Sequence, residues 1–186
     1  MTDVILAIDQ GTTGSTIALM DTAGHLVASV NHEFPQIFPE PGWVEHNTES
    51  IWQSILKGIA AIFADGAYKP GNVVAIGITN QRETAVLWDA QTGEALHNAI
   101  VWQCRRTTGA CEDLKAAGHE ALIRDRSGLV LDPYFSATKF KWLLDNSPGA
   151  QQLLAQGRLR DGTIHAYLMR RLSNGKDPQT AVSNPA

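Results

Sequence analysis

The stretch from Val4 to Asp21 constrains the fold of this chain more than any other, because it indicates two apolar strands joined by a short polar turn. Residues 4–8 are apolar and too few for a helix of ordinary length, so a buried strand is expected. A second apolar run follows from Ser15 to Met20. Between the two runs the sequence places Asp9 and then a turn made of Gln10, Gly11, Thr12, Thr13 and Gly14.

The residues of this turn suit a metal-bound polyphosphate. We expect the glycines to permit positive φ values and a close approach of a ligand to the backbone. The backbone amides and the two threonine hydroxyls can face an anion, while Asp9 can hold a metal ion or its water shell. An ordinary hairpin with a polar tip explains the same residues, and neither a Walker A motif nor a Rossmann fingerprint is present. On these residues alone both interpretations stay open.

The remainder of the chain mixes strands and helices, which predicts an α/β fold. A strand at 25–34 extends the hairpin into a three-strand meander, and a helix at 48–64 is expected to bury a face that includes Ile51, Ile55 and Leu56. The apolar strand at 73–79 is expected to be covered on both faces. Further strands are predicted at 85–88 and 99–102, and further helices at 105–117, at 119–126, at 136–146 with Ser136 as its cap, from Pro148 onward, and at 163–172.

A second polar cluster, NQRET at 80–84, directly follows the strand at 73–79. At a strand end or bulge, Arg82 and Glu83 can turn into one pocket, where the arginine offers donors and the glutamate offers acceptors. Neighbouring hydroxyls of a polyol need both kinds of partner. An exposed ion pair is the competing interpretation. Further along, Trp102 either packs against the carbon chain of a polyol or belongs to the core, and the Tyr134 hydroxyl can meet a ligand oxygen.

The charge balance favours small-molecule partners. With a formal net charge of -4 and 18% charged residues, the chain gives no electrostatic reason to expect nucleic acid or an anionic membrane as a partner. Arg105 and Arg106 stand at a predicted helix start, where the helix dipole disfavours cations, so we expect a carboxylate or an anionic ligand beside them.

The two cysteines and the N-terminal residues indicate in which cellular compartment the protein is expected. Cys104 and Cys111 are seven residues apart, which is neither a disulfide framework nor a zinc-binding spacing, so we expect reduced, half-buried residues of one helix. Asp3 stands where a targeting segment would be basic, and no apolar run approaches the length of a membrane span. The expectation is a soluble cytoplasmic protein.

Several segments together resemble the N-terminal domain of the FGGY carbohydrate kinase family, in the family's order and over nearly the whole chain. They are AIDQGTTGS (Ala7–Ser15), PGWVEHN (Pro41–Asn47), GITNQRET (Gly77–Thr84), NAIVWQCRR (Asn98–Arg106) and DPYFSATKFKWLLD (Asp132–Asp145). The runs GITNQRE and VWQCRR are similar to the members that phosphorylate glycerol rather than to the sugar kinases. The resemblance implies a ribonuclease H-like (actin-like ATPase) domain, an α/β fold whose mixed sheet has an antiparallel three-strand meander followed by α/β units.

The resemblance also implies roles for individual residues. Thr12 and Thr13, in the loop with Gly11 and Gly14, are expected to contact the phosphates of ATP, and Asp9 to lie near the magnesium ion. The glycerol hydroxyls are expected to meet Arg82, Glu83 and Tyr134, with Trp102 packed against the carbon atoms. The ligands implied are therefore ATP, Mg and glycerol.

The sequence departs from the family at four places. Gly14 replaces a frequent serine and Thr16 a common arginine, which lowers the nucleotide affinity that the resemblance implies. His165 replaces the usual aspartate of a Gly-Thr-(Ile/Val)-Asp motif, and the tail TAVSNPA at 180–186 matches the family only loosely.

Family members are more than twice as long as this chain, with a second domain that holds most of the adenine site. After a Gly-Asp-Gln motif that domain supplies the aspartate that acts as general base, so no catalytic residue is expected within this chain. Residues 1–186 are accordingly expected to form an N-terminal kinase domain, incomplete at its C-terminal end, whose partner is its own C-terminal domain. Self-association into a homo-oligomer stays open.

The function expected for the full-length protein is ATP-dependent phosphorylation of glycerol to glycerol 3-phosphate. The 186-residue chain alone is expected to be inactive, because phosphoryl transfer depends on positioning and on charge stabilisation between two closing halves. One alternative is another FGGY polyol or sugar kinase. The other is a non-catalytic, actin-like ligand-binding module, which the replacement at Thr16 favours.

Overall fold

The computed structural model describes residues 3–175, and these residues divide into two compact units. One unit consists of residues 3–36 and 47–81, and the other of residues 37–46 and 82–175. Each unit contains a four-stranded sheet of its own. The loosely matching tail at 180–186 lies outside the described residues.

The first unit confirms the predicted meander. Its strands β1 (Val4–Gln10), β2 (Gly14–Asp21) and β3 (Leu26–Glu33) pair antiparallel in sequence order. Strand β5 (Val73–Asn80) then pairs parallel with β1, which gives the sheet order β3-β2-β1-β5. The parallel pairing needs a crossover, and helix α1 supplies it.

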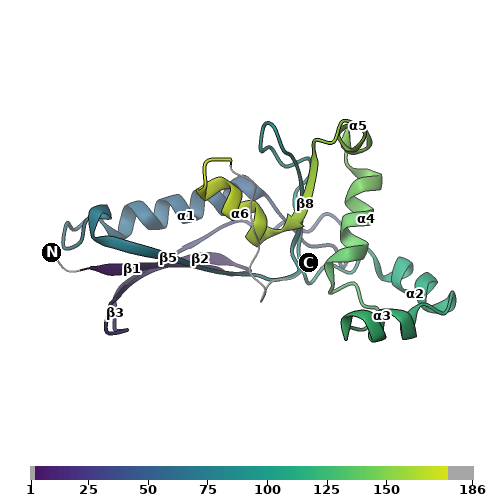
Figure 1. Ribbon diagram of the computed structural model, residues 1–186, viewed down its shortest axis with the longest axis horizontal. Coiled ribbons are helices and arrows are strands. Elements are labelled where there is room, and N and C mark those ends of the chain that lie inside the picture. Colours follow the sequence, from purple (N-terminus) through teal and green to yellow (C-terminus); the bar gives the residue numbers. More distant parts are fainter. Residues whose placement is uncertain (1–2, 176–186) are drawn as a thin grey trace. The chain divides into compact units, whose positions relative to one another are not determined.

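Helix α1 (Thr48–Ile62) runs along the sheet of the first unit (Figure 1). Its N-cap is Asn47, whose side-chain oxygen accepts a hydrogen bond from the Ser50 amide at 2.9 Å, as residues of this type do at helix starts. Ile51 and Ile55 are fully buried, as predicted, but Leu56 is exposed, so its assignment to the buried face was wrong. A short 3-10 helix, η1 (Pro70–Asn72), leads from α1 into β5.

The expectation that β5 is covered on both faces is also wrong for the described part of the chain. Most of its residues are exposed, and Val74 and Ile76 are among the large exposed hydrophobic side chains. The physical reason is that, among the described strands, β5 lies at the edge of this sheet and pairs with β1 alone. An apolar strand therefore presents uncovered surface in the first unit.

The second unit is built on an antiparallel sheet in the order β4-β7-β6-β8. Its strands are β4 (Glu45–His46), β6 (Ala85–Asp89), β7 (Ala99–Ile100) and β8 (Leu159–Thr163). Strand β6 is buried at every position, which agrees with its apolar sequence. The sequence did not predict β4 or β8, because both carry charged residues without a strand-like alternation.

Five helices complete the second unit: α2 (Thr108–Ala116), α3 (Glu120–Ser127), α4 (Ser136–Asn146), α5 (Ala150–Ala155) and α6 (Ile164–Leu172). Because α2 begins at Thr108, Cys104 lies before the helix, contrary to prediction. Cys104 and Cys111 are both free thiols, as predicted, but they are fully buried rather than half-buried. Within residues 3–175 no helix has both the length and the apolar character needed to cross a membrane.

Candidate functional site

The tip of the β1–β2 hairpin is closed by a hydrogen bond from the Gly11 amide to the Gly14 carbonyl at 2.9 Å. Neither glycine has a positive φ, so that part of the prediction was wrong. Gly14 instead lies close to the next strand, since a Cβ there would lie 3.0 Å from the His32 carbonyl oxygen and 3.2 Å from the Glu33 Cα. The close approach at this turn is therefore between two strands of the sheet.

The two threonines of the tip are held through their carbonyl groups. Gln36 donates its side-chain amide to the Thr12 carbonyl at 3.1 Å, and the Phe34 amide donates to the Thr13 carbonyl at 3.3 Å. Thr13 and Asp9 are both exposed. The tip therefore has a fixed backbone, while the Thr13 hydroxyl and the Asp9 carboxylate are open to a ligand.

The predicted metal site has one carboxylate. Among the described residues no group of three or more His, Cys, Asp or Glu side chains is placed to hold a metal ion. A magnesium ion is commonly held by one or two carboxylates together with phosphate oxygens and water. Asp9 therefore fits a magnesium ion that arrives with a polyphosphate, and it does not form a dedicated metal cage.

In the second unit, the Glu83 carboxylate is bound to the first turn of α4. Its Oε2 accepts hydrogen bonds from the Ser136 amide at 2.9 Å and from the Ser136 hydroxyl at 2.6 Å. The prediction that Ser136 caps α4 was therefore wrong: the N-cap is Phe135, and the Ser136 hydroxyl donates to Glu83. Glu83 also has a φ of 64°, which non-glycine residues rarely adopt outside functional or strongly supported positions.

Tyr134 and Trp102 form an aromatic pair next to this turn. Their ring centroids are 5.8 Å apart with an interplanar angle of 66°, an edge-on arrangement that aromatic pairs favour. Tyr134 is 39% exposed, so its ring is accessible in the described chain. Because Tyr134 and Ser136 are two residues apart, the structure brings the Tyr134–Trp102 pair and the Glu83 carboxylate to the same start of α4.

Arg82 is exposed, in contrast to Glu83 beside it. Across residues 3–175 the Arg82 guanidinium takes part in no hydrogen bond or ion pair. The surface ion pair between Arg82 and Glu83, which was the competing interpretation, is therefore not formed among the described residues. The arginine is left with unused donors next to a fixed carboxylate.

The predicted carboxylate partners of the two arginines before α2 are confirmed. Arg105 pairs with Asp132 at 3.1 Å, and Arg106 pairs with Glu45 at 2.7 Å. The Arg105 pair is partly exposed, whereas the Arg106 side chain is fully buried. Asp132 also accepts a hydrogen bond from the Tyr134 amide at 2.8 Å, and this bond is the main reason that the pKa of Asp132 is lowered.

Sequence reasoning missed three residues that hold the site, namely Asp132, Ser136 and Lys139. The Asp-Pro-Tyr order was a usable signal for Asp132, because aspartate often bonds the backbone amide two residues on. For Ser136 and Lys139 no local signal exists, since their partners depend on the turn that precedes α4.

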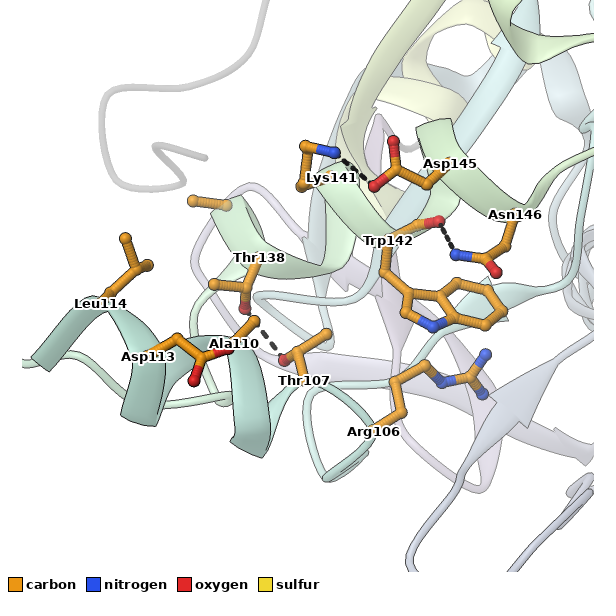
Figure 2. A pocket seen from close by; sticks show the side chains of 11 residues that line it. Arg106, Thr107, Ala110, Asp113, Leu114, Thr138, Lys141, Trp142, Asp145 and Asn146 are labelled. Atoms are coloured by element: carbon orange, nitrogen blue, oxygen red, sulfur yellow. Dashed lines mark hydrogen bonds and ion pairs between the residues drawn. The ribbon is translucent and has the colours of Figure 1, made fainter. Parts of the chain in front are cut away.

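Two pockets open beside α4. The first, of about 440 Å³, lies between α2 and α4, and Figure 2 shows Trp142 and Arg106 on one side of it and Leu114 on the other. None of the predicted substrate residues lines it. The second pocket, of about 540 Å³, is lined mostly by apolar residues. Its polar lining residues include Glu83, Asp132 and Ser136. The second pocket therefore adjoins the carboxylate that the sequence assigned to a polyol.

The chain belongs to the FGGY family of carbohydrate kinases, because the pattern of that family's N-terminal domain matches residues 4–184. It is similar to the glycerol kinase of Symbiobacterium thermophilum, with 53% identity over 180 residues, which cover 97% of this chain and 36% of that protein. The glycerol kinase of Geobacillus kaustophilus is 50% identical over 184 residues, which cover 99% of this chain and 37% of that protein.

Among solved structures, the chain is similar to a crystal structure of Plasmodium falciparum glycerol kinase with ADP. The TM-score is 0.87 at 33% identity, over 95% of this chain and 35% of that one. The predicted ribonuclease H-like, actin-like ATPase fold is thereby confirmed. The chain spans little more than a third of the length of these relatives.

Proposed function

We propose that this chain is the glycerol- and phosphate-contacting N-terminal part of an ATP-dependent glycerol kinase, which converts glycerol to glycerol 3-phosphate. The observation that carries the proposal is the Glu83 carboxylate, held in a left-handed backbone conformation at the start of α4 beside the Tyr134–Trp102 pair. The glycerol kinases that are about half identical to this chain support the same substrate.

The chemistry of these residues suits a small polyol. Each hydroxyl of glycerol both donates and accepts a hydrogen bond, so a site needs acceptors and donors close together. Glu83 supplies carboxylate oxygens, Arg82 supplies guanidinium donors, and the Tyr134 hydroxyl serves as either. Trp102 offers a flat apolar surface for the carbon chain. A substrate that lacks one of the hydroxyls leaves a polar group of the site unpaired and is disfavoured.

The hairpin tip of the first unit suits the phosphates of ATP. Backbone amides and the hydroxyls of Thr12 and Thr13 are donors for phosphate oxygens. A magnesium ion near Asp9, when bound with the nucleotide, supplies positive charge that stabilises the transferring phosphoryl group. The general base is expected from the part of the family's length that this chain does not span. The proposed role of this chain is therefore to bind and orient glycerol and the phosphates of ATP.

A chimera tests the proposal. In it, this chain replaces the matching N-terminal segment of the Symbiobacterium thermophilum glycerol kinase, to which it is 53% identical. We expect ADP formation that depends on glycerol and yields glycerol 3-phosphate, with erythritol and xylulose turned over poorly. The chain alone is expected to show no glycerol-dependent ADP formation.

Three results would contradict the proposal. A chimera that prefers xylulose or another sugar would indicate a different FGGY kinase. A folded chimera that binds ADP but phosphorylates no polyol would favour a non-catalytic module. Glycerol-dependent ADP formation by the isolated chain would refute the expectation that the general base lies in the part of the family's length that this chain does not span.

A further inference from the structure

Lys139 is a fully buried lysine on α4, with none of its side chain accessible to solvent. An ammonium group in such a place is costly unless it is hydrogen-bonded or paired. Its Nζ donates to two backbone carbonyls, that of Pro133 at 3.1 Å and that of Tyr134 at 2.5 Å. Burial lowers the pKa of Lys139 to about 8, and Glu83 is the strongest of the nearby charges that act in the opposite direction.

The two carbonyls belong to the turn just before α4, which carries the Tyr134 side chain. The amide of Tyr134 donates to the Asp132 carboxylate at 2.8 Å, and its carbonyl accepts from Lys139. The backbone is thus held on both sides of the Tyr134 Cα, while the ring is exposed and meets Trp102 edge-on. Lys139 therefore fixes where an accessible side chain points.

The same helical turn also binds Glu83, the other residue of this turn's surroundings that is proposed to contact glycerol. Ser136 and Lys139 are three residues apart, so they stand on the same side of α4. Ser136 binds the Glu83 carboxylate, and Lys139 binds the backbone of Tyr134. The first turn of α4 therefore contacts both residues, Glu83 through Ser136 and Tyr134 through Lys139.

We propose that Lys139 is a positioning residue of the glycerol site, which fixes Tyr134 through its carbonyl. This inference rests on the function proposed above. In this proposal Lys139 does not contact the substrate; it acts through Tyr134, which does. Its loss disturbs the binding of glycerol more than the binding of ATP, because Tyr134, whose carbonyl it holds, belongs to the polyol site.

The test is Lys139→Met in the chimera, which keeps most of the side-chain volume and removes the charge and the donors. We expect the KM for glycerol to rise about tenfold or more, as for a lost charge-assisted hydrogen bond, with the KM for ATP little changed. Lys139→Gln, which retains a donor for one carbonyl, should recover part of the glycerol affinity. The matched control is Lys141→Met on the same helix, since Lys141 is exposed and pairs with Asp145.

The outcomes separate this inference from the proposed function. If the unmodified chimera does not phosphorylate glycerol, the proposed function fails and the inference fails with it. If the unmodified chimera is active and folded Lys139→Met has an unchanged KM for glycerol, only the inference is overturned. Loss of the folded state in both Lys139 variants would assign the residue to stability alone and would also overturn the inference.

Discussion

Glu83 and Ser136 are 53 residues apart in the sequence, yet the Ser136 amide and hydroxyl both donate to one carboxylate oxygen of Glu83, at 2.9 and 2.6 Å. A carboxylate at the first turn of a helix also interacts favourably with the helix dipole. The two residues tie the strained backbone at Glu83 to the start of α4. This contact is what gives the proposed glycerol site a fixed acceptor.

Ser136→Ala should therefore weaken glycerol binding. The substitution removes the shorter of the two hydrogen bonds but leaves the amide, so we expect the KM for glycerol in the chimera to rise by roughly threefold to tenfold. Ser147→Ala is the control, because the buried Ser147 hydroxyl has no hydrogen-bond partner among the described residues. Equal effects of the two substitutions on the KM would argue against a role for Ser136 in holding Glu83.

Gly58→Ala should destabilise the first unit, although alanine is the better helix former. A Cβ at Gly58 would lie 2.4 Å from Cγ1 of Ile17, so α1 would have to move away from β2. Overpacking of this kind costs about 1–3 kcal/mol, against a gain of at most about 1 kcal/mol in helix propensity. Gly109→Ala in α2 has open space around its Cβ and should be neutral or slightly stabilising. Urea unfolding of the full chain compares them, and a stabilised Gly58→Ala would contradict this packing.

The pair of Glu45 and Arg106 is expected to be important for the stability of the second unit. The Arg106 guanidinium lies 3.9 Å from the ring centroid of Trp43 and 4.5 Å from that of Trp142. Glu45→Ala leaves this buried cation without its partner, which costs about 3–5 kcal/mol. Tryptophan fluorescence during denaturant unfolding is a suitable measurement, since two of the tryptophans flank the arginine.

A surface pair provides the comparison for Glu45. Glu112 binds Lys115 at 3.0 Å on the exposed side of α2. Exposed pairs contribute little to stability, so Glu112→Ala should leave the unfolding midpoint nearly unchanged. A shift as large as that of Glu45→Ala would show that burial does not distinguish the two pairs.

His46 should make the chain less stable in mild acid. Burial lowers the pKa of His46 from 6.5 to about 4. Below pH 6.5 the unfolded chain takes up a proton at His46, while the folded chain does not. The contribution of His46 to the free energy of unfolding is therefore fully present above pH 6.5 and is lost as the pH falls towards 4. The loss attributable to this residue is about 3 kcal/mol.

Urea midpoints between pH 7 and pH 4 measure this effect, with His46→Gln as the comparison. The pKa values of Asp89 and Asp132 are also lowered, but these carboxyl groups titrate equally in both proteins. The difference between the two pH profiles therefore reports on His46. Parallel profiles would contradict the assignment.

The elements with a strong local pattern could be predicted from the sequence. The apolar runs of β1 and β2 depend on neighbouring residues, and both strands were found where expected. Strand β8 was missed because its pairing with β6, rather than its own composition, makes it a strand. The exposure of β5 could not be read from its apolar sequence, since coverage depends on what packs against it.

For the candidate site, the sequence predicted which residues would take part but not the hydrogen bonds that hold them in place. Glu83, Trp102 and Tyr134 were selected by resemblance and by chemistry, and the structure places all three around the start of α4. The bonds from Ser136 and Lys139 could not be predicted, because they join segments whose meeting depends on the tertiary fold. The left-handed backbone at Glu83 has the same origin: a conformation that is unfavourable locally is held by the bonds to α4.

The most direct test of the account is the kinetics of Glu83→Gln in the chimera, with glycerol and ATP varied separately. We predict an active parent and a variant whose KM for glycerol rises about tenfold or more while its KM for ATP stays within about twofold. An active parent whose glycerol KM is unchanged by Glu83→Gln would contradict the glycerol site placed at Glu83.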